Sequence, residues 1–330
     1  MKRILIVTIA YRVGERIYPI IPQLASEYTI DVLRVYQMHP TFNWPGTIDM
    51  RKHFEEKYNK YFNNIFYKKE DIDYSKYSLI IYDDSRVNNG GDWIYQQAKC
   101  PVVSCSHGNG DEKNMYLDNI NKVFDKLFLF GKQEVTRPYI VAAGIPSNDS
   151  LINYVSVKKE YILLIVNFLG NHEAPFLKFD KKCFDNINLL ELQQLYNKPI
   201  IIKLKSRHNN GSVNNDQQYL KSVLPKNLDY NVVVDTTDDN LLIAKSELVI
   251  GAPSTLMVKP IQLRIPTVMF KGYGQVGIFK NHPGLIELGK NNIHSVSQYK
   301  TSEEYIENLI AGGSTFTSTN VFINNIKQII

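Results

Sequence analysis

The sequence predicts an α/β fold with two Rossmann-like domains that face a central cleft. Apolar runs of strand length alternate with helix-length segments along most of the 330 residues. Such alternation is typical of parallel sheets joined by right-handed crossovers. The alternation begins at Ile4 and restarts near Tyr161, which indicates a second sheet. The chain is also longer than one ordinary domain, and its apolar content of 44% suffices for two cores.

The first half of the chain predicts one sheet with its helices. We expect buried strands at residues 4–8, 29–36, 79–82, 101–105 and 123–130, and helices at 15–27 and 92–98, with 131–137 leading into a further short helix. The opening unit lacks the G-x-G-x-x-G fingerprint, which argues against a dinucleotide held in the usual way. An insertion at about 37–75 is rich in charges, Tyr and Phe, with helical spacing over 51–69. It either borders an acceptor cleft or is a solvated helix with an aromatic core face.

The second half predicts another sheet. Its strands are expected at 161–166, 199–205, 232–235, 247–250 and 267–270, its helices at 184–196, 217–224, 238–245, 255–264 and 318–330, and loops at 167–179 and 209–215. We therefore predict an N-terminal domain over 1–155 and a C-terminal domain over 156–315. The last stretch, 316–330, is expected to carry a helix that packs back on the first domain.

A candidate phosphate site follows the strand at 247–250. Small residues at 251–253 break this strand, Ser254 is the expected helix N-cap, and Thr255 is the expected first helical residue. The free N–H groups and the positive end of the helix dipole favour an anion there, and the two hydroxyls add donors. The sequence thus predicts a phosphate site at the carboxyl end of a strand. A plain serine cap without a ligand is the alternative.

Composition limits the partners and the location. A net charge of +5 suits anionic ligands or an anionic membrane surface, and does not favour nucleic acid. The three cysteines have no zinc-ligand spacing and indicate a reducing compartment. The N-terminal apolar run ILIVT is too short for a signal h-region, and no apolar run approaches the length of a membrane span. We expect a cytoplasmic protein, with peripheral binding at the inner membrane face left open.

Four segments in sequence order carry a resemblance to a known family. They are His107-Gly108 after a strand, GIPSND at 144–149, the strand with Lys203, and SELVIGAPSTLMVKPIQLRIPTVMF at 246–270. They resemble the H-G, G-x-P-R-x-D, K-x-H-P and S-S helix segments of the CDP-glycerol glycerophosphotransferase family. More loosely, the layout is similar to polysialyltransferase-like enzymes and UDP-N-acetylglucosamine 2-epimerases. The resemblance covers roughly residues 100–270 and implies the GT-B glycosyltransferase architecture.

Three positions depart from the family pattern. Ser147 stands where the family has arginine, and the His-Pro dipeptide after Lys203 is absent, with His208 as a candidate replacement. Lys259 stands where many GT-B enzymes have the glutamate that holds the ribose hydroxyls. Pro260 follows it and should kink the helix.

The resemblance assigns the first domain to the acceptor and implies that His107 is the general base. A histidine after a strand, between Ser106 and Gly108, also has a pKa suited to proton transfer near neutrality. The small neighbours leave room for an acceptor. Asp83, Asp84 and Asp111 are candidates to orient the histidine or to bind acceptor hydroxyls. The alternative is a histidine that makes its hydrogen bonds within its own loop and has no catalytic role.

The resemblance assigns the second domain to the donor. The basic cluster Lys203, Lys205, Arg207 and His208 would lie beside the donor diphosphate, together with Ser254, Thr255 and Lys259. Cations there would stabilise charge on the leaving nucleotide, so we expect neither a metal nor a further cofactor. CDP, CMP or UDP is the favoured nucleotide. A solvated basic loop is the alternative reading of the cluster.

These inferences predict a transferase. It would move a glycosyl or polyol-phosphate group from a nucleotide-activated donor to a hydroxyl of a glycan or polyol, in surface polysaccharide or glycan synthesis. One alternative is a nucleotide-sugar epimerase on the same fold, which would need carboxylates as acid and base. Another is a DNA-modifying or non-catalytic GT-B protein.

Overall fold

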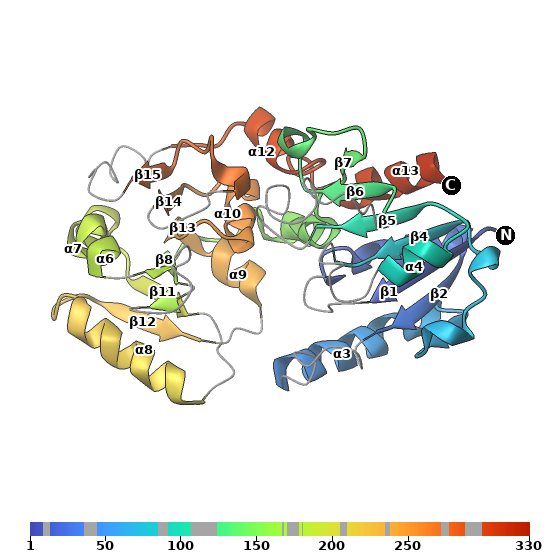
Figure 1. Cartoon of the computed structure of the whole chain (residues 1–330). Helices are drawn as coiled ribbons and strands as arrows, with labels where there is room; N and C mark the ends of the chain where they lie inside the picture. The colour runs from blue at the N-terminus through green and yellow to red at the C-terminus, as the bar shows by residue number, and fades with distance from the viewer. Residues whose placement is uncertain are drawn as a thin grey trace. The chain divides into compact units, whose positions relative to one another are not determined.

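A computed structural model describes residues 1–8, 14–35, 45–84, 92–106, 124–166, 168–169, 178–179, 181–204, 210–234, 238–271, 277–287 and 299–330. The chain divides into two compact units (Figure 1). Unit 1 comprises Met1–Asp149 and Glu304–Ile330, and unit 2 comprises Ser150–Glu303. The units therefore divide a few residues before the boundary expected from the sequence, and the C-terminal stretch belongs to unit 1.

Unit 1 contains a seven-stranded sheet with the order β3-β2-β1-β4-β5-β6-β7. Its strands are β1 (Arg3–Thr8), β2 (Thr29–Arg34), β3 (Asn64–Phe66), β4 (Leu79–Tyr82), β5 (Val102–Cys105), β6 (Lys126–Leu129) and β7 (Ile140–Ala142). Every pair of neighbours is parallel. The five strands expected from the sequence are confirmed. The sequence analysis missed β3 and β7, which form the two edges.

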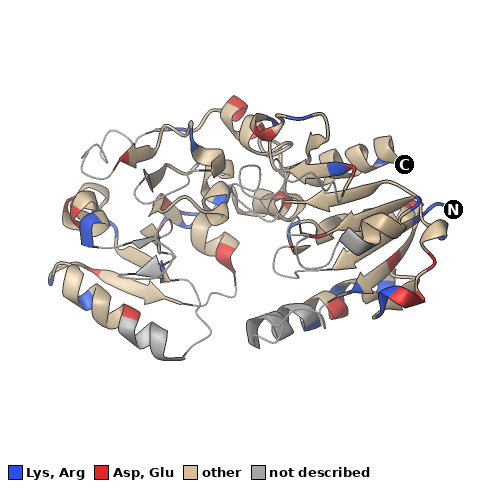
Figure 2. Ribbon diagram, viewed as in Figure 1, with Lys and Arg blue, Asp and Glu red and all other residues tan. Residues whose placement is uncertain are grey.

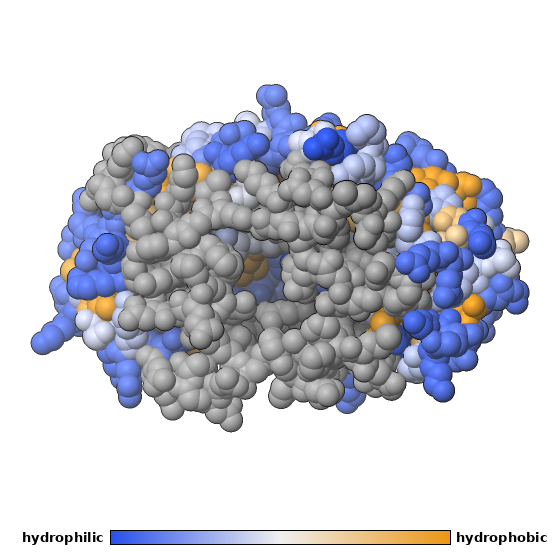
Figure 3. Space-filling view, in the orientation of Figure 1, coloured by the Kyte–Doolittle hydropathy of each residue, from blue (hydrophilic) through white to orange (hydrophobic). Residues whose placement is uncertain are grey.

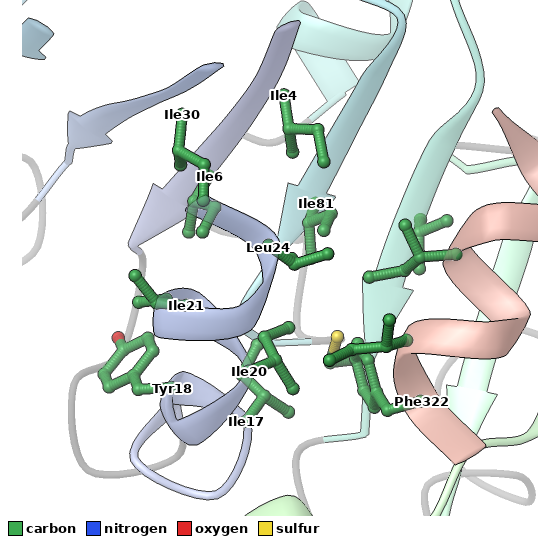
Figure 4. Packing of buried hydrophobic residues seen from close by; sticks show 14 of the residues in the cluster. Ile4, Ile6, Ile17, Tyr18, Ile20, Ile21, Leu24, Ile30, Ile81 and Phe322 are labelled. Carbon is green, nitrogen blue, oxygen red and sulfur yellow. The ribbon is translucent and has the colours of Figure 1, made fainter. Parts of the chain in front are cut away.

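Helices cover both faces of this sheet. They are α2 (Ile21–Glu27), α3 (Pro45–Tyr58), α4 (Asp92–Gln97), α12 (Glu303–Leu309) and α13 (Ser318–Ile329). Ile4 and Ile6 of β1 point to the face that holds α2, α3 and α13, whereas Leu5 and Val7 point to the face that holds α4. Figure 4 shows Phe322 of α13 among the side chains that fill the first face. Because alternate residues of each strand face opposite layers, the central strands are mainly apolar.

The insertion differs from the predicted long helix. We expected helix over 51–69, but α3 ends at Tyr58, and a 3-10 turn (Asn59–Tyr61) leads into β3. Arg34, at the end of β2, has only 2% of its surface exposed. It donates to Glu55 at 3.1 Å and to the Tyr67 hydroxyl at 3.3 Å. This buried cation thus ties α3 and the segment after β3 to the sheet.

Unit 2 contains a six-stranded parallel sheet with the order β12-β11-β8-β13-β14-β15. Its strands are β8 (Tyr161–Val166), β11 (Ile200–Leu204), β12 (Tyr230–Val233), β13 (Ser246–Gly251), β14 (Thr267–Lys271) and β15 (Leu285–Glu287). A separate pair joins β9 (Phe168–Leu169) to β10 (Lys178–Phe179). Counted along the chain, both large sheets begin with the strand order 3-2-1-4-5-6 of the Rossmann fold. The prediction of an α/β fold with two Rossmann-like domains is confirmed.

The helices of unit 2 differ from the sequence prediction in three places. They are α6 (Lys181–Ile187), α7 (Leu189–Tyr196), α8 (Asn210–Val223), α9 (Asp239–Ala244) and α10 (Val258–Gln262). The single helix expected at 184–196 is two helices, because Asn188 adopts a left-handed conformation with φ 47°. The loop expected at 209–215 is wrong, since α8 begins at Asn210. The helix expected at 255–264 starts as the 3-10 turn Thr255–Met257 and ends at Gln262.

Candidate functional site

Each large sheet has one place where its strand order reverses direction. In unit 2 this switch point lies between β8 and β13, and in unit 1 it lies between β1 and β4. Open α/β sheets bind ligands at such points, outside the carboxyl ends of the strands. Ser254 lies three residues beyond Gly251, the last residue of β13, so the predicted phosphate site lies at the switch point of unit 2.

Ser254 has an unusual environment for a helix cap. Its backbone is extended, and its carbonyl accepts a hydrogen bond from the Met257 N–H at 2.9 Å. The residue thus occupies the predicted N-cap position, but its side chain caps nothing. The hydroxyl oxygen is buried, and among the described residues it has no hydrogen-bond partner. A buried polar atom without a partner costs about 1–3 kcal/mol, which a ligand oxygen would offset.

Lys203 lies in the same cross-strand row as the end of β13. Lys203 of β11 pairs with Ile165 of β8, and Ile165 pairs with Gly251 on its other side. A side chain at Gly251 would place its Cβ 2.7 Å from the Ile165 carbonyl oxygen, so glycine keeps this row regular. The lysine side chain is 12% exposed and forms an ion pair with Asp239 at 3.4 Å.

The second lysine of the candidate site, Lys259, lies on α10. Its ammonium donates to the Asn240 side-chain oxygen at 2.7 Å. Asn240 follows Asp239 in the first turn of α9. One helical turn therefore contacts both Lys203 and Lys259, which the sequence placed beside the donor.

Asp238 fixes that turn of α9. Its carboxylate accepts from the backbone N–H of Asn240 at 2.9 Å and of Leu241 at 3.0 Å, and from the Tyr154 hydroxyl at 2.7 Å. Burial opposes the charged form, but these hydrogen bonds and the charge of Lys259 hold the pKa of Asp238 below its usual range. The sequence predicted a helix from residue 238 but assigned neither Asp238 nor Asp239 to the site, although aspartate is a favoured N-cap residue.

The switch point of unit 1 contains the predicted acceptor residues. Asp83 and Asp84 follow β4 and are each 1% exposed, and Ser106 follows β5 and is 5% exposed. The Tyr18 hydroxyl donates to the Asp83 carboxylate at 2.5 Å. Burial, and then the charges of Asp83 and Asp84, raises the pKa of the neighbouring Cys105 thiol. The fold thus brings Asp83, Asp84 and Ser106 to adjacent strand ends.

The remaining predicted site residues lie outside the described residues. They are His107, Gly108, Asp111, Lys205, Arg207 and His208. Within the described ranges, no group of three or more His, Cys, Asp or Glu could hold a metal ion. Nor does that part of the chain contain a helix that is both long and apolar enough to cross a membrane.

The described surface carries charges of both signs on both units (Figure 2). Hydrophilic residues predominate among the coloured atoms of the face shown in Figure 3.

The sequence matches no family model and no curated protein. Solved structures do match the whole fold. The UDP-GlcNAc 2-epimerase from Neisseria meningitidis, bound to UDP-GlcNAc, is 13% identical with a TM-score of 0.62, over 99% of this chain and 100% of that chain. A glycosyltransferase from Rickettsia africae ESF-5 is 12% identical with a TM-score of 0.60, over 99% and 97%. Anabaena Alr3699/HepE, in complex with UDP and glucose, is 12% identical with a TM-score of 0.57, over 99% and 99%.

At these identities the likeness concerns the fold alone. The predicted resemblance to the CDP-glycerol group stays a prediction. The two sheets and the structural neighbours together show that the chain has the GT-B fold, with two Rossmann-like domains.

Proposed function

We propose that this chain is an enzyme that uses a nucleotide-activated donor and transfers a glycosyl or polyol-phosphate group to a hydroxyl acceptor. The observation that carries the proposal is the buried Ser254 hydroxyl at the switch point of unit 2, with Lys203 in the adjoining row of strand ends. A diphosphate supplies acceptor oxygens for the hydroxyl and negative charge for the lysine. The structural neighbours bound to UDP-GlcNAc or to UDP and glucose support a nucleotide-sugar donor.

The residues of unit 2 would act on the leaving group. In a glycosyl transfer, the acceptor oxygen forms a bond to the anomeric carbon while the bond from that carbon to the diphosphate oxygen breaks. The electron pair leaves with the nucleoside diphosphate, where Lys203 and Lys259 would stabilise the developing charge. Ser254 and Thr255 would donate hydrogen bonds to the same phosphates. In a polyol-phosphate transfer, a nucleoside monophosphate leaves from the same place.

The residues of unit 1 would act on the acceptor. Asp83 and Asp84 are candidates to hold its hydroxyls, because buried carboxylates accept strong hydrogen bonds. The proton of the attacking hydroxyl would pass to His107, the predicted base. The acceptor would be a glycan or polyol of surface polysaccharide synthesis. We keep the cytoplasm, with peripheral binding to an anionic membrane surface, as the proposed location.

A specific observation favours a second candidate, a nucleotide-sugar epimerase. Epimerisation needs an acid and a base, and the two buried aspartates at the switch point of unit 1 could serve as such a pair. One structural neighbour is an epimerase bound to UDP-GlcNAc. Incubation with UDP-GlcNAc and no acceptor separates the candidates. Appearance of the C2 epimer supports the epimerase, and an unchanged sugar supports the transferase.

Thermal denaturation with CDP, CMP, UDP, GDP and ADP tests the donor site. One nucleotide should raise the melting temperature, because ligand bound to the folded state stabilises it by mass action. Replacing Ser254 and Thr255 together by alanine should weaken binding of that nucleotide by roughly 1–3 kcal/mol. Ser222→Ala, at an exposed hydroxyl of α8, is the matched control. Equal affinity in the double variant and the control would refute the placement.

Turnover with the identified donor tests the base. His107→Ala should lower kcat by about 100- to 10,000-fold and leave the nucleotide Kd unchanged. Wild-type turnover should persist in EDTA, since we propose that cationic side chains replace a metal. A variant with normal kcat, or a wild type inactivated by EDTA, would contradict this mechanism.

A further inference from the structure

The two lysines of the candidate donor site contact the same helical turn. Lys203 pairs with Asp239 at 3.4 Å, and Lys259 donates to Asn240 at 2.7 Å. Asp239 and Asn240 are the first two residues of α9. The two elements that carry the lysines, β11 and α10, are not neighbours in the sequence, so only the fold brings them to α9.

The turn of α9 is held in place by contacts of its own. Asp238 caps the helix through two backbone N–H groups and also accepts from Tyr154. The backbone of α9 continues into β13 through Lys245, whose N–H donates to the Leu241 carbonyl at 3.0 Å. These contacts fix the backbone of the turn that carries Asp239.

The described members of this cluster carry charges of both signs. Lys203 and Lys259 contribute two positive charges, and Asp238 and Asp239 contribute two negative charges. An anion that reaches Lys203 meets an ammonium whose field is already opposed by a carboxylate 3.4 Å away. Only 12% of the lysine side chain is exposed, so water screens this pair less than a surface pair.

We infer that Asp239 is an internal competitor for the phosphate-binding lysine, so that a phosphate group bound at Lys203 must displace this carboxylate. The inference rests on the proposed donor site. A single phosphate at Lys203 replaces the Asp239 carboxylate with another anion. The net gain in binding free energy is therefore small. A diphosphate brings a second group, which can take the hydrogen bond of the Ser254 hydroxyl while the first displaces the carboxylate.

Geometry is compatible with that division of roles. Lys203 and Gly251 lie on either side of β8 in one row, and strands are spaced by about 4.8 Å, so their Cα atoms are roughly 10 Å apart. A lysine side chain extends several ångströms from its Cα atom. Lys203 and the turn at 251–254 therefore belong to the same carboxyl edge of the sheet.

Isothermal titration of the full chain with pyrophosphate, inorganic phosphate and UDP tests the inference. Asp239→Asn removes the carboxylate and retains a side chain of the same shape. It should tighten pyrophosphate by about two- to fivefold, the value of one partly exposed ion pair. It should tighten inorganic phosphate by a similar factor, because either anion displaces the same carboxylate. Asp229→Asn, at an exposed aspartate of the same unit, should change neither constant.

A double-mutant cycle shows whether the effect passes through Lys203. In a Lys203→Met background, Asp239→Asn should no longer alter the pyrophosphate affinity by the same factor. Unchanged or weaker binding in a folded Asp239→Asn protein, with the wild type binding normally, overturns the inference alone. If the wild type binds neither pyrophosphate nor UDP, the proposed donor site is wrong and the inference falls with it.

Discussion

The carboxylate of Asp149 accepts a hydrogen bond at 2.8 Å from the backbone N–H of Ser318, which lies 169 residues further along the chain. Its second oxygen accepts from the N–H of Thr319 at 2.7 Å. The residue at the N-cap of α13, Thr317, makes no side-chain cap of its own. Asp149 therefore supplies the cap from the GIPSND segment and fixes the start of the last helix.

Replacing Asp149 by alanine should lower the free energy of unfolding by about 1–2 kcal/mol, because two N–H groups lose their acceptor. Asp149→Asn should retain part of the stabilisation, since the amide oxygen can still accept one of the two hydrogen bonds. Urea denaturation monitored by circular dichroism measures the difference. Asp229→Ala removes an exposed carboxylate and serves as the control. An alanine variant as stable as this control would contradict the capping role.

Phe322 should be the most sensitive position of α13. Its ring is 1% exposed and meets the Phe128 ring edge-on, with centroids 4.9 Å apart. Phe322→Ala should cost about 3–5 kcal/mol of unfolding free energy, because it leaves a cavity against the sheet. Phe322→Leu should cost less, and exposed Asn320→Ala should change little. Equal urea midpoints for the alanine variant and the wild type would exclude a core role for this ring.

Ser254→Ala should separate stability from binding. Alanine at an N-cap usually costs about 1 kcal/mol, but the Ser254 hydroxyl makes no cap bond. Removing a buried hydroxyl without a partner should therefore leave the free energy of unfolding within about 0.5 kcal/mol, or raise it. Parallel urea titrations of variant and wild type measure this. A loss of 1 kcal/mol or more would mean that the hydroxyl caps the helix in solution.

The buried His282 should make the free energy of unfolding depend on pH. Its Nδ1 accepts from the Gly284 N–H at 3.0 Å, and burial lowers its pKa from 6.5 to about 4. Because the unfolded chain binds the proton more readily, stability is fully present above pH 6.5 and falls as the pH drops towards 4. The loss is at most roughly 3 kcal/mol.

Urea denaturation between pH 4 and pH 8 measures this slope. His282→Asn keeps an acceptor near Nδ1 and removes the titrating group, so it should flatten the dependence in this window. His53→Asn, at an exposed histidine, should leave it unchanged. A slope that survives in His282→Asn would assign the effect to another group.

The sequence predicted the central strands well, because burial on both faces makes most of their residues apolar. The expected bounds of β4 and β8 agree with the structure, and all residues of both strands are buried. The edge strands β3 and β7 were missed because they are three residues long and only partly buried. Helix α8 was predicted too short because its first turns, NGSVNND, hold a single large apolar residue.

The candidate site was predicted only in part. Local sequence signals identified Ser254 and Lys203, since both depend on a strand end. The contacts of Asp239 with Lys203 and of Asn240 with Lys259 join elements far apart in the sequence, and no local pattern encodes them. The left-handed Asn188 that divides α6 from α7 was equally invisible, because helix periodicity continues across it.

Phe322, Ile323 and Ile326 complete the core of unit 1, yet the ribosome makes them only after the whole of unit 2. During synthesis part of one face of the N-terminal sheet therefore stays uncovered until α13 is made. This part includes the Phe128 ring, which Phe322 contacts in the folded chain. Unit 2, although made later, has all of its residues available first. Translation that stalls before α13 would leave a chain with one finished unit and one exposed apolar face, a natural substrate for chaperones.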